Sequence, residues 1–353
     1  MAELSGDICA AVHDAYQRSE SLYIAAGGSK RHIIGRECEA TPLDVCGHRG
    51  IIDYQPDELV LCARAGTPLG VLQEALALHN QVLPFDPPLF GDRATLGGTL
   101  ACNLSGPGRP WYGSIRDATL GIKLVNGKGE LLEFGGKVMK NVAGYDVSRL
   151  MAGALGTLGV VLETSFKVLP LPAKELTLEF SSGHNQAVMR MNEWSGQPLP
   201  LSAAAWQDGT LRIRLSGAAS EVDNAVGKLK PENVPDNNDY WSGLREHGLS
   251  FFDGNLPLWR ISVPPASTPW EVLGEFLIDW GGAQHWYRTQ EPAEEIRRHA
   301  DAAGGHAVLF RGPPDVEKFH PLPEAAARLQ QRVRDAFDPQ GIFNPEIIGG
   351  GGA

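Results

Sequence analysis

The chain has 353 residues, a length typical of two domains, and its 42% hydrophobic and 21% charged residues are enough to bury a sizeable core. Its formal net charge of −11 argues against nucleic acid or an anionic membrane surface as the main partner. Glycine departs from ordinary usage, because 15 of the 42 glycines fall between Gly91 and Gly159 with no fixed period. Such a dense, aperiodic stretch indicates backbone that approaches something closely.

Apolar spacing predicts the elements of the N-terminal half. Leu4, Ile8, Val12 and Ala15 recur at helical spacing, and Pro68 opens a second helix. A short third helix is predicted at Val147–Ala154. Short apolar runs predict strands at Leu22–Ala26, Leu43–Cys46, Ile51–Tyr54, Leu59–Ala63, Leu120–Val125, Glu130–Phe134, Leu158–Leu162 and Ser165–Val168. The dipeptide Asn126-Gly127 predicts a tight hairpin turn.

A Pro-Leu-Pro run at 170–172 marks the expected domain boundary. Beyond it we predict strands at Leu176–Phe180, Ala203–Trp206, Leu211–Leu215, Trp259–Val263, Gln284–Arg288 and His306–Phe310. Helices are predicted at Gln186–Trp194, Glu221–Lys230, Trp270–Ile278, Pro292–Ala303 and Glu324–Phe337. We therefore expect a first domain over 1–172, an α+β domain with a largely antiparallel sheet over 173–322, and a helix and tail over 323–348 that return to the first domain.

The motifs that the chain lacks exclude several familiar sites. It has no G-x-G-x-x-G after a strand, no P-loop and no H-E-x-x-H, which argues against a Rossmann dehydrogenase and a zinc hydrolase. The five cysteines contain no C-x-x-C, so we expect no metal or iron–sulfur cluster held by this chain alone. No secretory signal and no apolar run of about 18 residues is visible, so the sequence predicts a soluble, cytoplasmic protein.

Three glycine-rich segments of the first domain suggest a binding site. In Ala26–Lys30, two glycines can turn consecutive N–H groups toward an anion, and Ser29 with Lys30 can add a hydroxyl and a charge. Pro84–Gly108 offers small polar groups, and Gly156–Val161 passes from a tight turn into a strand. Each segment taken alone could be an ordinary turn or loop. Together they indicate one extended cofactor cradled mostly by backbone.

The residues resemble the flavin domain of the vanillyl-alcohol-oxidase (PCMH-type) superfamily, and within it the FAD-binding E subunits of bacterial glycolate oxidases (glycolate dehydrogenases). The resemblance covers nearly the whole chain. It is carried by CGHRGIIDYQPDELVLCARAGTPLGVLQEAL, LPFDPP…ATLGGTLA…LSGPGRPWYGSIRD, FGGKVMKNVAGYDVSRLMAGALGTLGVVLE and AFDPQGIFNP. It implies a two-domain α+β protein, with a PCMH-type FAD-binding fold and a smaller α+β domain.

The resemblance implies FAD as the cofactor. Ala26–Lys30 would hold its pyrophosphate, a second group would line the pyrophosphate and isoalloxazine, and the turn before Val161 would meet the adenine end or the ring edge. The residues so implied are Ala26, Gly27, Gly28, Ser29, Lys30, Thr95, Gly97, Gly98, Asn103, Ser105, Gly106, Asp117, Gly156, Gly159 and Val160. No histidine lies in the first loop, so we expect non-covalent FAD.

For catalysis the chain departs from its relatives. Related 2-hydroxy-acid dehydrogenases, including the sister D subunit, carry an H-G-x-G-x-x-H type cluster, whereas Gly304–Arg311 holds one histidine and one arginine. His306 and Arg311 could supply the base and the carboxylate anchor, and Tyr145 or Lys140 could reach the flavin. Alternatively, His306 is a core residue and Arg311 pairs with a carboxylate, so no catalytic residue is assigned.

The resemblance implies a subunit of a multisubunit enzyme that oxidises glycolate to glyoxylate. Its implied partners are an FAD-containing catalytic D subunit and an iron–sulfur F subunit, with electrons leaving toward quinone and any membrane contact made only through the complex. Two alternatives stay open. One is a self-sufficient FAD oxidase of another hydroxy acid or sugar alcohol, and the other is a subunit that keeps the flavin fold for assembly with little chemistry.

Overall fold

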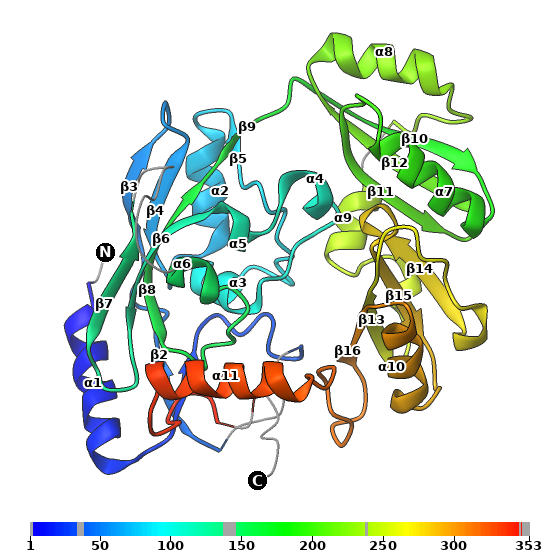
Figure 1. The fold of residues 1–353 in the computed structure, drawn as a ribbon. Helices are drawn as coiled ribbons and strands as arrows, with labels where there is room; N and C mark the ends of the chain where they lie inside the picture. Colours follow the sequence, from blue (N-terminus) through cyan, green and yellow to red (C-terminus); the bar gives the residue numbers. More distant parts are fainter. Residues whose placement is uncertain (1–2, 34–38, 137–145, 237–238, 346, 348–353) are drawn as a thin grey trace. The chain divides into compact units, whose positions relative to one another are not determined.

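A computed structural model describes residues 3–33, 39–136, 146–236, 239–345 and 347 of the chain (Figure 1). The chain divides into two compact units. Unit 1 consists of Met1–Leu104, Gly113–Pro170 and Pro321–Ala353, and unit 2 of Ser105–Tyr112 and Leu171–His320. The chain therefore enters unit 2 twice, once in the short segment 105–112 and once at the proline run that the sequence marks as a boundary.

Unit 1 is built around a five-stranded antiparallel sheet in the order β3-β4-β8-β6-β7. The strands are β3 (Ile51–Gln55), β4 (Val60–Arg64), β6 (Thr119–Val125), β7 (Leu131–Gly135) and β8 (Val160–Lys167). Successive side chains of a strand point to opposite faces of the sheet. In this sheet the side chains on both faces are apolar, and helices cover both faces. Helix α1 (Ser5–Arg18) packs on one face through Ile8, Val12 and Ala15. The helices on the other face are α2 (Leu69–Ala77), α3 (Leu96–Cys102), α5 (Ile115–Ala118) and α6 (Val147–Leu150).

Two smaller strand pairs complete unit 1. β1 (Leu22–Ala25) and β2 (Thr41–Asp44) are parallel, and β5 (Gln81–Val82) and β9 (Leu169–Pro170) are antiparallel. The C-terminal segment joins the first pair after helix α11 (Glu324–Phe337), because the chain at residue 343 runs parallel to β1.

Asp338 holds the turn that brings the C-terminal segment to β1. Its carboxylate accepts hydrogen bonds from the backbone N–H groups of Ile342 and Phe343, at 3.1 and 2.8 Å. Beyond the turn, the N–H of Leu22 donates to the carbonyl of Ile342 at 2.7 Å, and the N–H of Asn344 donates to the carbonyl of Leu22 at 2.8 Å. The tail signature AFDPQGIFNP is therefore a structured connection whose last residues extend the β1–β2 pair.

Unit 2 contains a seven-stranded antiparallel sheet in the order β10-β12-β11-β14-β15-β13-β16, which confirms the predicted antiparallel α+β architecture. The strands are β10 (Lys174–Ser181), β11 (Leu201–Gln207), β12 (Thr210–Gly217), β13 (Leu258–Ser262), β14 (Glu275–Asp279), β15 (Gln284–Arg288) and β16 (His306–Arg311). Helices α7 (His184–Ser195) and α8 (Ala219–Leu229) pack on one half of the sheet, and α10 (Ala293–Ala302) packs on the other. Two short helices, α4 (Arg109–Tyr112) and α9 (Asp239–Arg245), also belong to unit 2.

The predicted helix at Trp270–Ile278 is wrong. That segment forms a single 3-10 turn, η2 (Glu271–Leu273), and then strand β14 in the middle of the sheet. Leu273, Leu277 and Ile278 are all buried, so the helix-like spacing of apolar residues arises from a turn followed by a central strand. Short apolar runs cannot be assigned to helix or strand by their spacing alone.

Three other predicted bounds also change. β6 and β7 pair up to Val125 and Leu131, so the connection is the five-residue loop 126–130 rather than a two-residue turn. Asn126 organises it by accepting from two backbone N–H groups of the loop, and the positive φ falls on Gly129, at 81°. The two strands predicted between 158 and 168 form the single strand β8, and the helix predicted from Val147 ends at Leu150.

Candidate functional site

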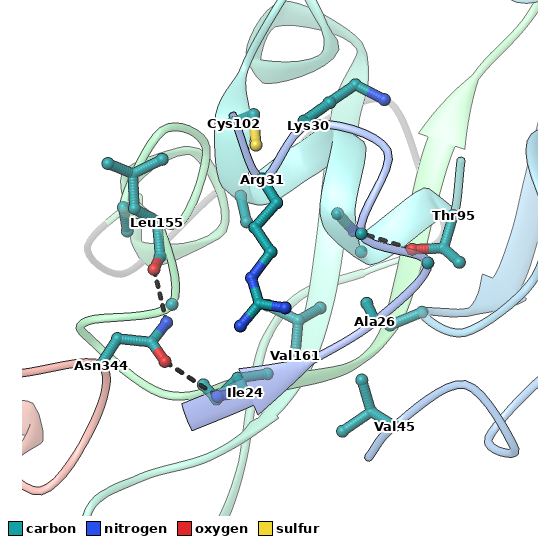
Figure 2. A pocket seen from close by; sticks show the side chains of 18 of the residues that line it. Ile24, Ala26, Lys30, Arg31, Val45, Thr95, Cys102, Leu155, Val161 and Asn344 are labelled. Atoms are coloured by element: carbon teal, nitrogen blue, oxygen red, sulfur yellow. Dashed lines mark hydrogen bonds between the residues drawn. The ribbon is translucent and has the colours of Figure 1, made fainter. Parts of the chain in front are cut away.

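Unit 1 contains a hollow of about 930 Å³, counted out to its open mouth. Its walls come from four parts of the chain that are distant in sequence: β1 with the loop after it, α3, the turn before β8, and the C-terminal segment (Figure 2). All three glycine-rich segments predicted to cradle a cofactor therefore reach the same place. The predicted residues that line the hollow are Ala26, Gly27, Gly28, Ser29, Lys30, Thr95, Gly97, Gly98, Gly156 and Gly159.

The loop after β1 carries donors suited to an anion. Within the described residues, the N–H groups of Gly27, Gly28 and Ser29 donate no hydrogen bond. Gly28 has a φ of +72°, the left-handed conformation in which successive N–H groups turn toward one side. The Lys30 ammonium group lies 3.4 Å from the Ser29 hydroxyl, and Lys30 is only 4% exposed. The loop therefore combines available backbone donors with a buried positive charge.

The start of α3 forms a wall of the hollow in which the backbone donors are already used. The N–H of Leu96 donates to the carbonyl of Thr67 at 2.9 Å, and that of Gly97 donates to the carbonyl of Ala65 at 2.7 Å. The N–H of Gly98 donates to the Thr95 hydroxyl at 3.2 Å, which caps the helix. This segment accordingly has no spare backbone donor at its first turn, and the available backbone donors lie in the loop after β1.

Asn344, which sequence reasoning missed, holds the turn before β8 in place. Its side-chain oxygen accepts from the N–H of Ile24 at 2.8 Å, and its side-chain nitrogen donates to the carbonyl of Leu155 at 2.7 Å (Figure 2). Gly156 makes room for this clamp, because a Cβ at that position would lie 2.5 Å from the Asn344 nitrogen. The available signals were the tail signature AFDPQGIFNP, which carries Asn344, and the expected return of the tail to the first domain, but neither assigned Asn344 to the hollow.

Arg31 and Cys102 are two further lining residues that the sequence did not indicate. Figure 2 shows Arg31 extending into the hollow, and its guanidinium carbon lies 4.9 Å from the centre of the Tyr23 ring. It adds a second positively charged residue to the lining of the hollow. Burial raises the pKa of the Cys102 thiol to about 11, so this group stays protonated at neutral pH and supplies no thiolate nucleophile.

The other predicted cofactor residues lie outside the lining of the hollow. Asn103 ends α3 with a φ of 48°, and its buried side-chain oxygen has no hydrogen-bond partner among the described residues. Asp117 accepts from the N–H and hydroxyl of Ser114, both at 2.8 Å, and so caps α5. Val160 is fully buried in the core.

Ser105 and Gly106 belong to unit 2. The carbonyl of Gly106 accepts from the indole N–H of Trp280 at 3.0 Å, which fixes the segment on unit 2. The buried hydroxyl of Ser105 has no partner in the described part of the chain. It remains able to donate to a bound group.

The two catalytic candidates of unit 2 do not form a pair. His306 begins β16 and Arg311 ends it, so five residues of strand hold their Cα atoms about 16 Å apart. The Arg311 guanidinium donates to the carbonyl of Phe252 at 2.6 Å. A hydroxy acid carries its carboxylate and hydroxyl on neighbouring carbons, so one molecule cannot engage both residues. The candidates Tyr145 and Lys140 lie outside the described residues.

The hollow fits FAD on three observations. Its glycine-lined backbone leaves room for a flat ligand, the loop after β1 presents available N–H groups, and Lys30 and Arg31 supply positive charge for a pyrophosphate. The described residues contain no cluster of three or more histidine, cysteine or acidic side chains able to hold a metal ion. The arrangement therefore suits an extended anionic cofactor.

Comparisons with known proteins identify an FAD binding domain in this chain. Residues 2–135 match the family model of an FAD binding domain. D-2-hydroxyglutarate dehydrogenase of Xanthomonas citri pv. viticola is 35% identical over 133 residues, 37% of this chain and 28% of that protein. Glycolate oxidase subunit GlcD of Bacillus subtilis is 41% identical over 128 residues, 36% of this chain and 27% of that protein.

A solved structure of alkyldihydroxyacetonephosphate synthase superposes on 96% of this chain and 74% of its own with a TM-score of 0.69, at 17% identity. This likeness confirms the predicted two-domain fold of the vanillyl-alcohol-oxidase type. Glycolate oxidase subunit GlcE of Escherichia coli is 44% identical over 322 residues, which are 91% of each chain. With an FAD binding domain, this fold and that identity along nearly its whole length, the chain belongs to the family of glycolate oxidase subunit GlcE.

Proposed function

We propose that this chain is the FAD-binding subunit of a multisubunit glycolate oxidase (glycolate dehydrogenase), an enzyme that oxidises glycolate and related 2-hydroxy acids, in the case of glycolate to glyoxylate. The observation that carries the proposal is a hollow of unit 1 that the loop after β1, the start of α3 and the turn before β8 all line. The identity to glycolate oxidase subunit GlcE over 91% of the chain supports the same assignment.

Different residues of the hollow contact different parts of FAD. The N–H groups of Gly27, Gly28 and Ser29, with the charges of Lys30 and Arg31, hold the pyrophosphate. Bound FAD would supply a redox group that accepts electrons and passes them on. The loop contains no histidine for covalent linkage, so the cofactor is dissociable.

The oxidation of a hydroxy acid also needs a carboxylate anchor and a base close to one another. His306 and Arg311 lie at opposite ends of β16 and do not provide this combination. We therefore assign the dehydrogenation to an FAD-containing D subunit and the onward electron transfer toward quinone to an iron–sulfur F subunit. The match of residues in this chain to glycolate oxidase subunit GlcD supports such a partnership of related flavin domains.

The complex is placed in the cytoplasm, with contact to the inner membrane only through partner subunits. Among the described helices, none combines the length and apolar character that crossing a membrane requires.

Cofactor analysis of the purified chain tests the flavin assignment. Acid precipitation should release a yellow supernatant, because the FAD is not covalently bound. Arg31→Gln should weaken FAD binding by removing a charge from the hollow, whereas Arg18→Gln, an exposed arginine on α1, should leave it unchanged. Flavin that stays in the pellet, or a chain that never binds flavin, would contradict the proposal.

Anaerobic addition of glycolate separates the proposal from its two alternatives. The flavin of the isolated chain should stay oxidised, while the assembled complex should be reduced. Complete bleaching of the isolated chain within seconds would show a self-sufficient oxidase. A complex that keeps full turnover when this subunit carries no FAD would show that the chain serves assembly alone.

A further inference from the structure

We propose that unit 2 binds a small 2-hydroxy carboxylate on one face of its sheet, at a site formed by Arg260, Trp286 and Gln284. The choice of glycolate as the ligand to test rests on the proposed function, whereas the site itself rests on the arrangement of these three side chains. None of them belongs to the flavin hollow of unit 1.

Strand pairing places the three side chains on one face. β13 and β15 are antiparallel neighbours in which Arg260 lies opposite Trp286 and Ser262 lies opposite Gln284. Residues directly opposite in an antiparallel pair project to the same face, with Cβ atoms ~5 Å apart. Gln284 and Trp286 are two residues apart on β15 and therefore share that face, ~7 Å from each other. The opposite face is packed against α10 through Ile261 and Tyr287.

Arg260 and Trp286 present two hydrogen-bond donors that lack an acceptor. Neither Arg260 Nε nor Trp286 Nε1 has a partner among the described residues, although both atoms are buried. Trp286 is 5% exposed, and the Arg260 guanidinium lies 6.0 Å from the centre of the Phe310 ring. Buried N–H groups without acceptors are rare in native proteins because their desolvation is not compensated. Two such donors on opposite positions match the two oxygens of a carboxylate.

Gln284 presents the complementary group, a buried acceptor without a donor. The side chain is 2% exposed, and its Nε2 donates to Asp279 Oδ2 at 3.2 Å. An ionised carboxylate only accepts hydrogen bonds, so this contact fixes which end of the amide is the nitrogen. The remaining atom, Gln284 Oε1, has no donor in the described protein. A hydroxyl group beside a carboxylate would donate to it, which an anion without an O–H group cannot do.

Charge around the three residues favours an anion. Burial, followed by the charge of Arg109, lowers the pKa of Arg260 to about 10, so Arg260 stays cationic at neutral pH. Arg109 is held 4.5 Å above the ring of Trp280. Burial, followed by the charge of Arg260, also lowers the pKa of His306, which keeps that imidazole neutral near pH 7. Two carboxylates of β14 lie on this face by register. Asp279 already accepts from the N–H of Trp280 at 2.7 Å and from Gln284, and Glu275 accepts from Arg288 at 3.2 Å.

Calorimetric titration of the full chain with its FAD tests the site. We expect sodium glycolate to bind more tightly than acetate, which lacks the hydroxyl, and 2-hydroxyacetamide, which lacks the charge, to bind least. Arg260→Gln should weaken glycolate binding about tenfold or more, in line with the loss of a hydrogen bond to a charged group. Arg298→Gln, an exposed arginine of α10 on the other side of the sheet, is the matched control and should bind normally. Gln284→Met should remove the preference for glycolate over acetate.

Binding of glycolate, acetate and 2-hydroxyacetamide to the wild-type chain tests the site even if a variant fails to fold. Absence of glycolate binding to the wild type, equal binding of glycolate and 2-hydroxyacetamide, or unchanged binding by a folded Arg260→Gln would each overturn the site. A complex that oxidises glycolate while the chain binds none would refute the site and leave the proposed function standing. A chain that binds glycolate within a complex that cannot oxidise it would refute the proposed function and leave the site.

Discussion

His285 is a histidine that folding removes completely from water. It lies on β15 opposite Ile261 and Ile278, it is 0% exposed, and neither of its ring nitrogens has a partner in good hydrogen-bond geometry within the described protein. Burial lowers the pKa of His285 to about 4, and the backbone of Gly282 only partly opposes this effect. Unit 2 should therefore lose stability in acid because this one imidazole must stay neutral.

The size and sign of the effect follow from the two pKa values. In the unfolded chain the imidazole of His285 titrates near 6.5, so on acidification the unfolded state takes up the proton first and its free energy falls relative to that of the folded state. The stability is fully present above pH 6.5 and is lost as the pH falls toward 4. The loss amounts to about 2 kcal/mol at pH 5 and about 3 kcal/mol at pH 4.

Urea unfolding of wild type and His285→Leu between pH 7 and 4.5, followed by tryptophan fluorescence, measures this loss. Subtracting the two curves cancels the other titrating groups, so the free energy of unfolding of the variant should rise relative to wild type by about 2 kcal/mol on going from pH 7 to 5. Leu277→Ala, a buried non-titrating change on β14, should instead cost about 2–5 kcal/mol at every pH. A difference between wild type and His285→Leu that does not vary with pH would refute the reasoning.

Three further predictions concern the flavin hollow and β16. Gly28→Val should abolish flavin retention and lower the melting temperature, because a β-branched residue is strained at a φ of +72°, and equal flavin content in the purified variant would contradict this. Asn344→Asp keeps the size of the side chain and, like asparagine, tolerates a positive φ, but it replaces the amide that donates to the Leu155 carbonyl with an acceptor. The affinity for FAD, measured by flavin fluorescence, should therefore fall about tenfold. Arg311→Ala should leave glycolate turnover of the assembled complex within a few-fold, and a steep rise in KM with assembly intact would show that Arg311 anchors substrate.

The sequence predicted most elements correctly where a strong local pattern decides the structure. The helix containing Ile8 and Val12 and the terminal helix at Glu324–Phe337 were confirmed because the spacing of their apolar residues acts within a few residues. Trp270–Ile278 was wrong because pairing with β11 and β15, which no local pattern shows, makes part of it a central strand. Tertiary contacts overrode the local preference there.

Some residues of the candidate site could likewise be predicted from local sequence patterns, and others could not. The glycine turns at Gly28 and Gly156 could be recognised because a positive φ restricts the choice of residue. Asn344 could not, because its role depends on contacts with Ile24 and Leu155, which lie 320 and 189 positions away in the chain. His306 and Arg311 do not come together, because they are close in sequence but lie at opposite ends of an extended strand.

The clamp formed by Asn344 has a consequence for how the protein is made. The loop at Gly28 leaves the ribosome early, but the residue that ties β1 to the turn before β8 is synthesised 316 positions later, the difference between 344 and 28. At ordinary rates of translation this interval lasts roughly 15–60 s. Completion of the hollow is therefore a late event in the biogenesis of this chain, and nascent chains that stall before Asn344 would expose an incomplete hollow to chaperones and proteases.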